Sequence, residues 1–407
     1  MRRVGTLDLG LLAVAVALWC LLLVFLPAGM SPDGWYALLG GDVIVHHGLP
    51  SHDTLTVWGY GRRWVDQQWL AQLAYYGLYA LGGLRLALLA NAAVVVGSFW
   101  AAAQLGGARR AVLWVPALAA IALGVSSSAL RPQTLVLPLF VAVAWLLAED
   151  ARAPSRRVFW AIPLLVLWAN LHGTATLGVL LVLLAVATEA WPRRRPTWRT
   201  SSLGVLAFAA LFASPYAAHL PGYYRTVLFN GEFAKYLPDW MPTALAPATA
   251  AFYLLAFVAV FAMARAPRSL TLFEKWTVVV LLVLAVEATR GVTWFTLFVL
   301  VALPQALDAW SLPSLRIPGS RAAVLLVAGI ALVVTASRPS SWFTRDYPTS
   351  SAHLVAEVAG PNAAVFANGA FDDWLLLKEP SLRGRVAYDA RFEVLPHGRL
   401  ADAAAVS

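Results

Sequence analysis

The chain has 407 residues, of which 60% are hydrophobic and only 13% are charged. Soluble domains carry about 25% charged residues, so this composition excludes a soluble globular protein and a disordered chain. The formal net charge of +9 at pH 7 does not indicate a nucleic-acid partner, because the positive residues fall in short loops between apolar segments, where they set membrane topology. Long apolar runs recur without the alternation of barrel strands, so the sequence predicts an all-α polytopic membrane protein.

The first apolar run follows Met1-Arg2-Arg3 and resembles a signal peptide in composition. It is long for that purpose, and Pro27-Ala28-Gly29-Met30 is a poor cleavage site, so we expect an uncleaved first membrane helix. Ten further apolar segments follow it. The predicted spans, with approximate boundaries, cover residues 7–27, 86–105, 111–127, 131–148, 158–171, 174–191, 201–216, 246–265, 274–289, 291–308 and 321–337.

The distribution of positive charge orients these spans. With the N-terminus inside, sixteen lysine and arginine residues fall in inner loops, and seven fall in outer loops before residue 338. This asymmetry follows the positive-inside rule, so we expect the N-terminus inside and the C-terminus outside. Residues 69–83 are apolar but short, and counting them as a span would place the arginine clusters outside. We therefore assign them to the outer membrane interface, where Trp and Tyr side chains are favoured.

The chain divides into a membrane domain, residues 1–337, which includes a first external loop with amphipathic helices, residues 28–85, and a small outer tail, residues 338–407. A tail of about 70 residues is short for an independent core, so we expect it either to pack on the membrane domain or to be incomplete. Its pattern predicts an α/β arrangement. The predicted elements are two strands and a helical turn, at residues 363–367, 385–388 and 371–377.

The richest polar signal lies directly after the first span. Ser31-Pro32-Asp33-Gly34-Trp35 opens a short amphipathic helix, and the segment His47-Gly48-Leu49-Pro50-Ser51-His52-Asp53 follows it. An aspartate in this position, followed by an aromatic residue and a His-Gly-x-Pro-x-x-Asp end, resembles the first external loop of the GT-C superfamily. These are polytopic glycosyltransferases that use polyprenyl-phosphate-linked sugars. They include the oligosaccharyltransferase catalytic subunit, protein O-mannosyltransferases and aminoarabinose transferases.

The resemblance covers the plan of about eleven spans with an outer tail, and it implies that Asp33 acts at the reaction centre. Many members carry two adjacent acidic residues, whereas Gly34 follows Asp33 here. In an inverting transfer, an acceptor hydroxyl attacks the anomeric carbon while the lipid phosphate leaves, and a carboxylate takes the hydroxyl proton. Asp33 is therefore the predicted base. The alternative is that Asp33 only caps the helix that follows it.

His52 and Asp53 are predicted acceptor-binding residues, although a plain turn explains Asp53 equally well. Together with His46 and His47 they bring four potential metal ligands into a short segment. Their spacing matches no established ligand motif, so the sequence predicts no metal site and identifies no cofactor. A divalent metal is nevertheless compatible with the chemistry.

Cationic residues that can hold a lipid phosphate occur at three outer mouths of spans. Arg131 opens the fourth span, His172 lies in the tight turn Asn170-Leu171-His172-Gly173-Thr174, and Arg290 joins two further spans. We predict these three as donor-phosphate ligands, because fixed guanidinium groups bind phosphate oxygens bidentately. The alternatives are an interfacial anchor for Arg131 and an ion pair with Glu287 for Arg290.

Three more residues are predicted to contact the acceptor. Asn170 lies at or near bilayer depth and is expected to face the cavity, with hydrogen bonding between helices as the alternative. Tyr224 and Trp240 belong to the outer loop 217–245. Their aromatic faces suit a sugar or an isoprenoid, although any interfacial loop has a similar composition.

The leading interpretation is a membrane glycosyltransferase that moves a sugar from a polyprenyl-phosphate carrier to an acceptor, with inversion, at the outer face of the cytoplasmic membrane in a bacterial cell envelope. The expected partners are the lipid-linked sugar donor, the lipid bilayer and a glycan, lipid or protein acceptor. A transporter or flippase of a lipid-linked solute would bind the same phosphate without chemistry, but its polar groups would lie at mid-bilayer rather than at one surface. An inactive GT-C-like assembly subunit is the third reading, because only one acidic residue occupies the motif.

Overall fold

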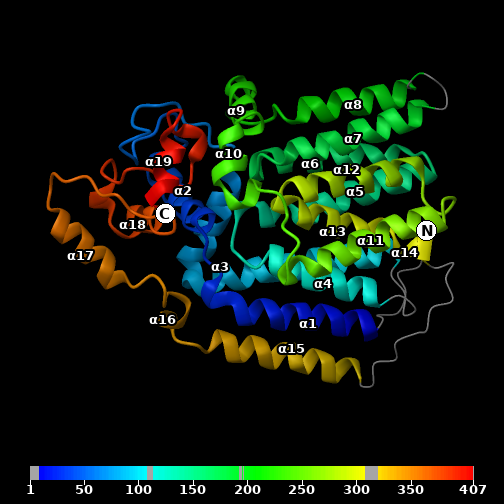
Figure 1. The fold of residues 1–407 in the computed structure, drawn as a ribbon, viewed down its shortest axis with the longest axis horizontal. Coiled ribbons are helices and arrows are strands. Elements are labelled where there is room, and N and C mark those ends of the chain that lie inside the picture. Colours follow the sequence, from blue (N-terminus) through cyan, green and yellow to red (C-terminus); the bar gives the residue numbers. More distant parts are fainter. Residues whose placement is uncertain (1–8, 108–112, 192–194, 196, 308–319, 407) are drawn as a thin grey trace.

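The computed structural model describes residues 9–107, 113–191, 195, 197–307 and 320–406. Its long helices lie side by side and roughly parallel (Figure 1). These helices are α1 (Leu9–Phe25), α3 (Trp69–Gly106), α4 (Trp114–Ser126), α5 (Leu137–Arg152), α6 (Ala161–Leu171), α7 (Ala175–Ala190), α8 (Trp198–Ala210), α11 (Ala250–Arg265), α12 (Leu272–Glu287), α13 (Val292–Ala302) and α15 (Arg321–Ala336). A second group of helices gathers at the end of the bundle where the C-terminus lies (Figure 1). They are α2 (Pro32–His47), α9 (Leu220–Leu228), α10 (Gly231–Tyr236), α16 (Ser340–Phe343), α17 (Thr349–Ala359), α18 (Asp372–Lys378) and α19 (Arg399–Val406).

Each of the eleven segments predicted as spans overlaps one of these long helices in the described part of the chain. By length and composition, four helical segments can cross a bilayer, namely Leu9–Ala28, Trp69–Gly106, Pro132–Arg152 and Pro247–Arg265. Shorter apolar helices, including α4, α7 and α15, extend the bundle. The chain is a multi-pass membrane protein, while eleven crossings and their direction stay predictions. The residues before Leu9, on which the uncleaved start depends, lie outside the described part.

Helix α13 forms the centre of the bundle, since every one of its residues is buried. Helices α3, α4, α5 and α12 pack around it. The close approach of α3 depends on Gly106, because a Cβ there would lie 2.0 Å from the Leu300 carbonyl oxygen. Near the start of α13, Trp294 packs with Phe140 and Trp168 at ring-centroid distances of 5.1 and 5.9 Å. This aromatic cluster makes the protein rigid next to the polar residues described below.

The segment assigned to the membrane interface, residues 69–83, forms the first part of α3. Its helical path is interrupted at Gly82 and Gly83, where Gly83 has a φ of 65°, a conformation that glycine adopts without steric cost. The kink separates this segment from the predicted second span. Helix α2 packs along α3, and Tyr76 Oη donates a hydrogen bond to Asp42 Oδ1 at 3.0 Å. These contacts hold the first external loop against the bundle.

Ion pairs join three helices at the far end of α5. Arg152, the last residue of α5, pairs with the buried Glu274 of α12. Arg199 of α8 pairs with Asp150 Oδ1 at 2.8 Å. Arg131 precedes the other end of α5, so these charges and the predicted phosphate ligand lie at opposite ends of that helix. Further predicted inner charges lie outside the described residues: Arg2, Arg3, Arg109, Arg110, Arg193, Arg194 and Arg316.

The predicted sheet in the tail is wrong for the described residues. Residues 363–367 and 385–388 meet only at the isolated bridge between Val365 and Val386. Val386 bridges to Val365 on one side and to Thr56 of the first external loop on the other, and neither pairing extends into a ladder. The helical turn predicted at residues 371–377 is confirmed as α18.

The tail packs on the membrane domain, which is one of its two expected arrangements. Gly384 N donates to Leu55 O at 2.7 Å, and Val57 N donates to Val386 O at 2.8 Å, so the tail and the first external loop share backbone hydrogen bonds. Helix α18 also packs against α2. The tail and the loop therefore build one structure above the end of the bundle.

The buried side chain of Arg391 connects the tail to the first external loop. Arg391 is fully buried, and its Nη2 donates to Asp53 Oδ1 at 2.7 Å while its Nε donates to Asp389 Oδ2 at 2.8 Å. Its guanidinium lies over the Trp64 ring, 4.1 Å from the centroid. Asp53 also accepts a hydrogen bond from Leu55 N at 2.8 Å. The acceptor contact predicted for Asp53 is therefore wrong, because its carboxylate is committed to a buried ion pair.

Replacing Arg391 with Met is expected to destabilise the protein by about 3–5 kcal/mol, because the change leaves two buried carboxylates without their cation. The measurement is the midpoint of thermal unfolding in lipid nanodiscs, followed by circular dichroism. Arg399→Met is the matched control, since Arg399 pairs with Asp402 at the surface, where such pairs contribute little. Equal midpoints for the two variants would contradict the structural role of Arg391.

Candidate active site

A cavity of about 560 Å³ lies where the helical bundle meets the first external loop, the loop 217–245 and the tail. Its volume falls in the range of roughly 300–1,000 Å³ that is typical of small-molecule sites. Most of the predicted site residues line it. They are Asp33, Arg131, His172, Tyr224, Trp240 and Arg290.

Local backbone pairing places Asp33 next to Arg131. Met30 and Leu130 form a parallel bridge, and Ser31 Oγ donates to Leu130 O at 3.0 Å. Asp33 follows Ser31 by two residues and Arg131 follows Leu130 directly, so the pairing brings both side chains to the same place. Arg131 Nε lies 3.8 Å from Asp33 Oδ2.

Asp33 does not cap helix α2, so that alternative role is wrong. The N-cap is Ser31, whose Oγ accepts a hydrogen bond from Gly34 N at 3.2 Å. Asp33 lies in the first turn, with 46% of its side chain exposed. Gly34 stands where the GT-C motif often has its second acidic residue, and a Cβ there would lie 2.9 Å from the Leu130 carbonyl oxygen. The close packing of α2 on residue 130 thus explains why only one carboxylate is present.

Arg131 keeps one hydrogen-bond donor without a partner. Its Nη1 forms an ion pair with Asp239, which lies in the short 3-10 helix η7 (Pro238–Trp240). Its Nε is buried and has no hydrogen-bond partner. A buried donor without a partner is costly, and an oxygen of an anionic ligand would satisfy it. The guanidinium is therefore suited to anion binding.

Arg290 lies in the 3-10 turn η9 (Thr289–Gly291), between α12 and α13. Its guanidinium carbon is 4.3 Å from the centroid of the Trp240 ring. The structural ion pair with Glu287 is absent in the described part of the chain, because α12 ends at Glu287 and the two side chains do not share a helix face. Stacking on Trp240 fixes the guanidinium plane and leaves its in-plane N–H groups available to a ligand.

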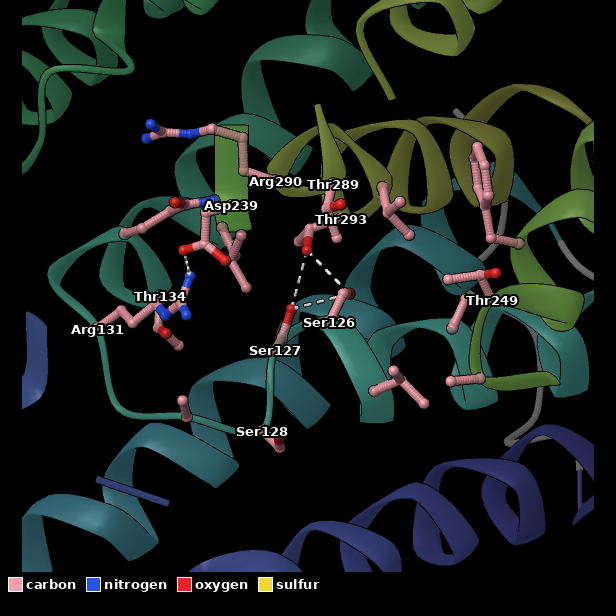
Figure 2. Close-up of a pocket in the computed structure, with 18 residues that line it drawn as sticks. Ser126, Ser127, Ser128, Arg131, Thr134, Asp239, Thr249, Thr289, Arg290 and Thr293 are labelled. Atoms are coloured by element: carbon pink, nitrogen blue, oxygen red, sulfur yellow. Dashed lines mark hydrogen bonds and ion pairs between the residues drawn. The ribbon is translucent and has the colours of Figure 1, made fainter. Parts of the chain in front are cut away.

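A smaller pocket of about 210 Å³ adjoins the cavity, and both arginines line it as well (Figure 2). Thr293 Oγ1 lies 3.0 Å from the hydroxyl oxygens of both Ser126 and Ser127. These hydrogen bonds tie the end of α4 to the start of α13 (Figure 2). The two arginines therefore stand between two spaces, each with its own polar lining.

His172 lies at the end of α6 and faces the cavity. Its Nδ1 accepts a hydrogen bond from Thr174 N at 3.1 Å. In the neutral ring this contact assigns the proton to Nε2, which then acts as a donor. His172 thus adds a third donor to the wall that holds the two arginines.

Besides Asp53, two further predicted acceptor contacts do not line the cavity. Asn170 Oδ1 accepts a hydrogen bond from Trp69 Nε1 at 3.0 Å, and its amide donates to Ala213 O at 2.7 Å. The alternative of hydrogen bonding between segments is therefore correct for Asn170. His52 is exposed and its ring lies 3.0 Å from the Ser51 hydroxyl oxygen, away from the cavity.

The four potential ligands near the end of α2 do not converge on one point. His46 Nδ1 lies 3.2 Å from Asp42 Oδ1, one turn earlier in the same helix. Asp53 is buried with Arg391, as described above. Within the described ranges, no group of three or more His, Cys, Asp and Glu side chains is placed to hold a metal ion.

Further polar residues line the cavity that the sequence did not point to as site residues, among them Gln67, Tyr223 and Glu393. Gln67 Oε1 is buried without a hydrogen-bond partner. Burial raises the pKa of Glu393 to about 7. The signal for Gln67 was the polar run Asp66-Gln67-Gln68 between two tryptophans, whereas Glu393 stands in no recognisable motif.

Comparison with known proteins agrees with this architecture. No protein-family model matches the sequence, and no curated protein matches it. Among solved structures, the chain is similar to the archaeal oligosaccharyltransferase AglB from Archaeoglobus fulgidus, solved with an inhibitory peptide and a dolichol-phosphate, at a TM-score of 0.53 and 11% sequence identity. The similarity covers 92% of this chain and 64% of that one. The chain therefore has a fold similar to that of this oligosaccharyltransferase.

Proposed function

We propose that this GT-C-like protein is a membrane glycosyltransferase, which moves a sugar from a polyprenyl-phosphate carrier to an acceptor hydroxyl with inversion. The observation that carries the proposal is one cavity in which the carboxylate of Asp33 adjoins the guanidinium groups of Arg131 and Arg290. The fold similarity to an oligosaccharyltransferase solved with a dolichol-phosphate supports this class of reaction. In the expected topology, the cavity opens at the outer face of the cytoplasmic membrane.

The donor phosphate binds between the two arginines in this proposal. Arg131 supplies its unpartnered Nε, Arg290 supplies its in-plane N–H groups, and His172 supplies Nε2–H. Negative charge grows on the leaving phosphate as its bond to the sugar breaks. Donors that are already in place stabilise that charge without reorganisation, which is the main electrostatic source of catalysis.

The sugar is then transferred in a single displacement. The acceptor oxygen forms a bond to the anomeric carbon from the face opposite the phosphate. The bond between that carbon and the phosphate oxygen breaks, and its electron pair stays on the phosphate. Asp33 takes the proton of the acceptor hydroxyl as general base. Tyr224 lies on the cavity wall and offers an aromatic face to the bound sugar, whereas Trp240 lines the wall with its ring stacked on Arg290.

The direct test uses the purified full chain in lipid nanodiscs. The protein is incubated with undecaprenyl- and dolichyl-phosphate-linked hexoses and a mixture of glycoside, peptide and lipid acceptors. We expect release of free polyprenyl phosphate together with a new glycoside product, both dependent on the protein. Failure of every donor to yield either product would contradict the proposal.

A further inference from the structure

One wall of the cavity is built by segments that are far apart in the sequence. Gln67 comes from the first external loop, Tyr223 from α9, and Glu393 from the 3-10 helix η11 (Phe392–Val394) of the tail. Helix α9 packs against η11, which brings the loop 217–245 next to the tail. None of these residues has a role in the donor-phosphate site described above.

The polar ends of the Gln67 and Tyr223 side chains both lie close to Gly173. A Cβ at Gly173 would lie 3.0 Å from Gln67 Oε1 and 3.2 Å from Tyr223 Oη, so the missing side chain leaves room for both polar atoms. Gln67 is only 6% exposed, and its Oε1 has no hydrogen-bond partner. A buried amide oxygen without a partner is costly, and a ligand that donates a hydrogen bond would remove that cost.

Glu393 adds a second acceptor to this wall. Its carboxylate forms no ion pair within the part of the chain that the structure describes. Burial raises its pKa to about 7, Arg391 opposes that rise, and the charges of Asp389 and Asp33 add to it. Burial raises the pKa values of the Tyr36 and Tyr223 phenols, and the nearby charge of Glu393 adds to that rise. Asp66 is a further neighbour, and Glu393 contributes to the rise in its pKa.

We propose that this wall is an acceptor site for a carbohydrate, whose hydroxyl groups donate hydrogen bonds to Gln67 Oε1 and to the Glu393 carboxylate. Both protein groups accept hydrogen bonds, so the ligand must be a donor. The nearby Arg131 and Arg290 disfavour a cationic donor, which leaves neutral hydroxyl or amide groups. A sugar ring presents adjacent hydroxyl groups and an apolar face, and Tyr223 and Tyr224 supply aromatic surface with ring centroids 5.4 Å apart.

This inference rests on the proposed glycosyl transfer, but its test does not require activity. The probe is a panel of methyl glycosides of the common hexoses and N-acetylhexosamines, with an N-acetylated peptide amide as the competing class. Binding to the full chain in nanodiscs is measured by saturation-transfer difference NMR. We expect at least one glycoside to bind with millimolar affinity, which is within the range of this method, and the peptide not to bind.

The variants Glu393→Gln and Gln67→Leu are each expected to weaken glycoside binding about tenfold. Gln67→Leu removes the acceptor oxygen, whereas Glu393→Gln removes the negative charge and replaces one acceptor oxygen by an N–H donor. Wild-type affinity should fall as the pH is lowered from 8 to 6, because Glu393 then takes up a proton and loses its charge. The Glu393→Gln variant should depend on pH less than the wild type, because the substituted side chain no longer titrates, whereas Asp66, whose pKa burial also raises to about 7, still titrates next to the wall. Glu357→Gln is the matched control, because Glu357 is exposed in α17 of the same tail and does not line the cavity.

Binding of undecaprenyl phosphate, measured in the same nanodiscs, separates this inference from the proposed function. If the lipid phosphate binds and no glycoside binds up to roughly 10 mM, the acceptor assignment is wrong while the donor site stands. Binding of the peptide alone would also overturn the assignment. If a glycoside binds and responds to both variants while undecaprenyl phosphate does not bind, the carbohydrate site stands and the proposed transfer fails.

Discussion

Asp33→Asn is expected to lower the rate of sugar transfer about 10²–10⁴-fold, because an amide cannot take the proton of the acceptor hydroxyl. Asparagine has nearly the same shape as aspartate, and Ser31 rather than Asp33 caps helix α2, so the fold should persist. The measurement is the initial rate of polyprenyl phosphate release at saturating donor. The thermal midpoint and the elution volume of the variant confirm that it is folded.

The control for Asp33 is Asp346→Asn, because Asp346 is exposed in the tail and pairs only with its neighbour Arg345. Its rate should equal that of the wild type. Donor binding should also survive in Asp33→Asn, since the phosphate ligands are unchanged. A folded Asp33→Asn protein with a transfer rate within about twofold of the wild type would remove Asp33 from the base role.

Arg290→Gln is expected to lower the transfer rate about 10²–10³-fold, the usual effect of removing one charged donor that stabilises a developing anion. Arg290→Lys should have an intermediate rate, because lysine keeps the charge but loses the planar fork that stacks on Trp240. Both the rate and the affinity for undecaprenyl phosphate are measured in nanodiscs, and the affinity should fall in the same order.

Arg225→Gln is the matched control for this series, since Arg225 is exposed on α9 and does not line the cavity. It removes the same charge from the same side of the protein. Long-range attraction of the phosphate would make both arginines contribute similarly, and this contribution would weaken in high salt. Equal losses in the two Gln variants would therefore contradict a direct contact between Arg290 and the donor.

The helical part of the fold could be predicted from the sequence because apolar length alone identifies such segments. The eleven predicted segments overlap long helices, although several boundaries differ: α3 begins at Trp69, well before residue 86, and α8 ends at Ala210, before residue 216. The strands predicted at 363–367 and 385–388 do not form a sheet. Their backbones pair only at isolated bridges, one within the tail and one to the first external loop, so tertiary context rather than local sequence decides their conformation.

The candidate site was predictable where polar residues interrupt apolar spans, as Arg131, His172 and Arg290 do. A polar group at such a place needs a partner, and a cavity supplies one. The same reasoning failed for Asp53 and Asn170, because their partners, Arg391 and Trp69, lie 338 and 101 residues away.

Gln67 and Glu393 were not predictable, since their position on one wall depends on how the loop and the tail pack together. No local pattern encodes that packing. Gly34 is a related case. A side chain at this position would approach the Leu130 carbonyl oxygen too closely, and the sequence alone does not reveal that contact. Close approach of two backbones is visible only in three dimensions.

A cryo-electron microscopy structure of the full chain in nanodiscs with undecaprenyl phosphate tests the central claim most directly. We expect the phosphate in the cavity, with its oxygens roughly 2.7–3.2 Å from Arg131 Nε and from an N–H group of Arg290, and with Asp33 on the side where the sugar would lie. The ion pair between Arg131 and Asp239 should be loosened or lost in that complex. A phosphate bound elsewhere, with both arginines still engaged as in the free protein, would contradict the assignment of this cavity as the donor site.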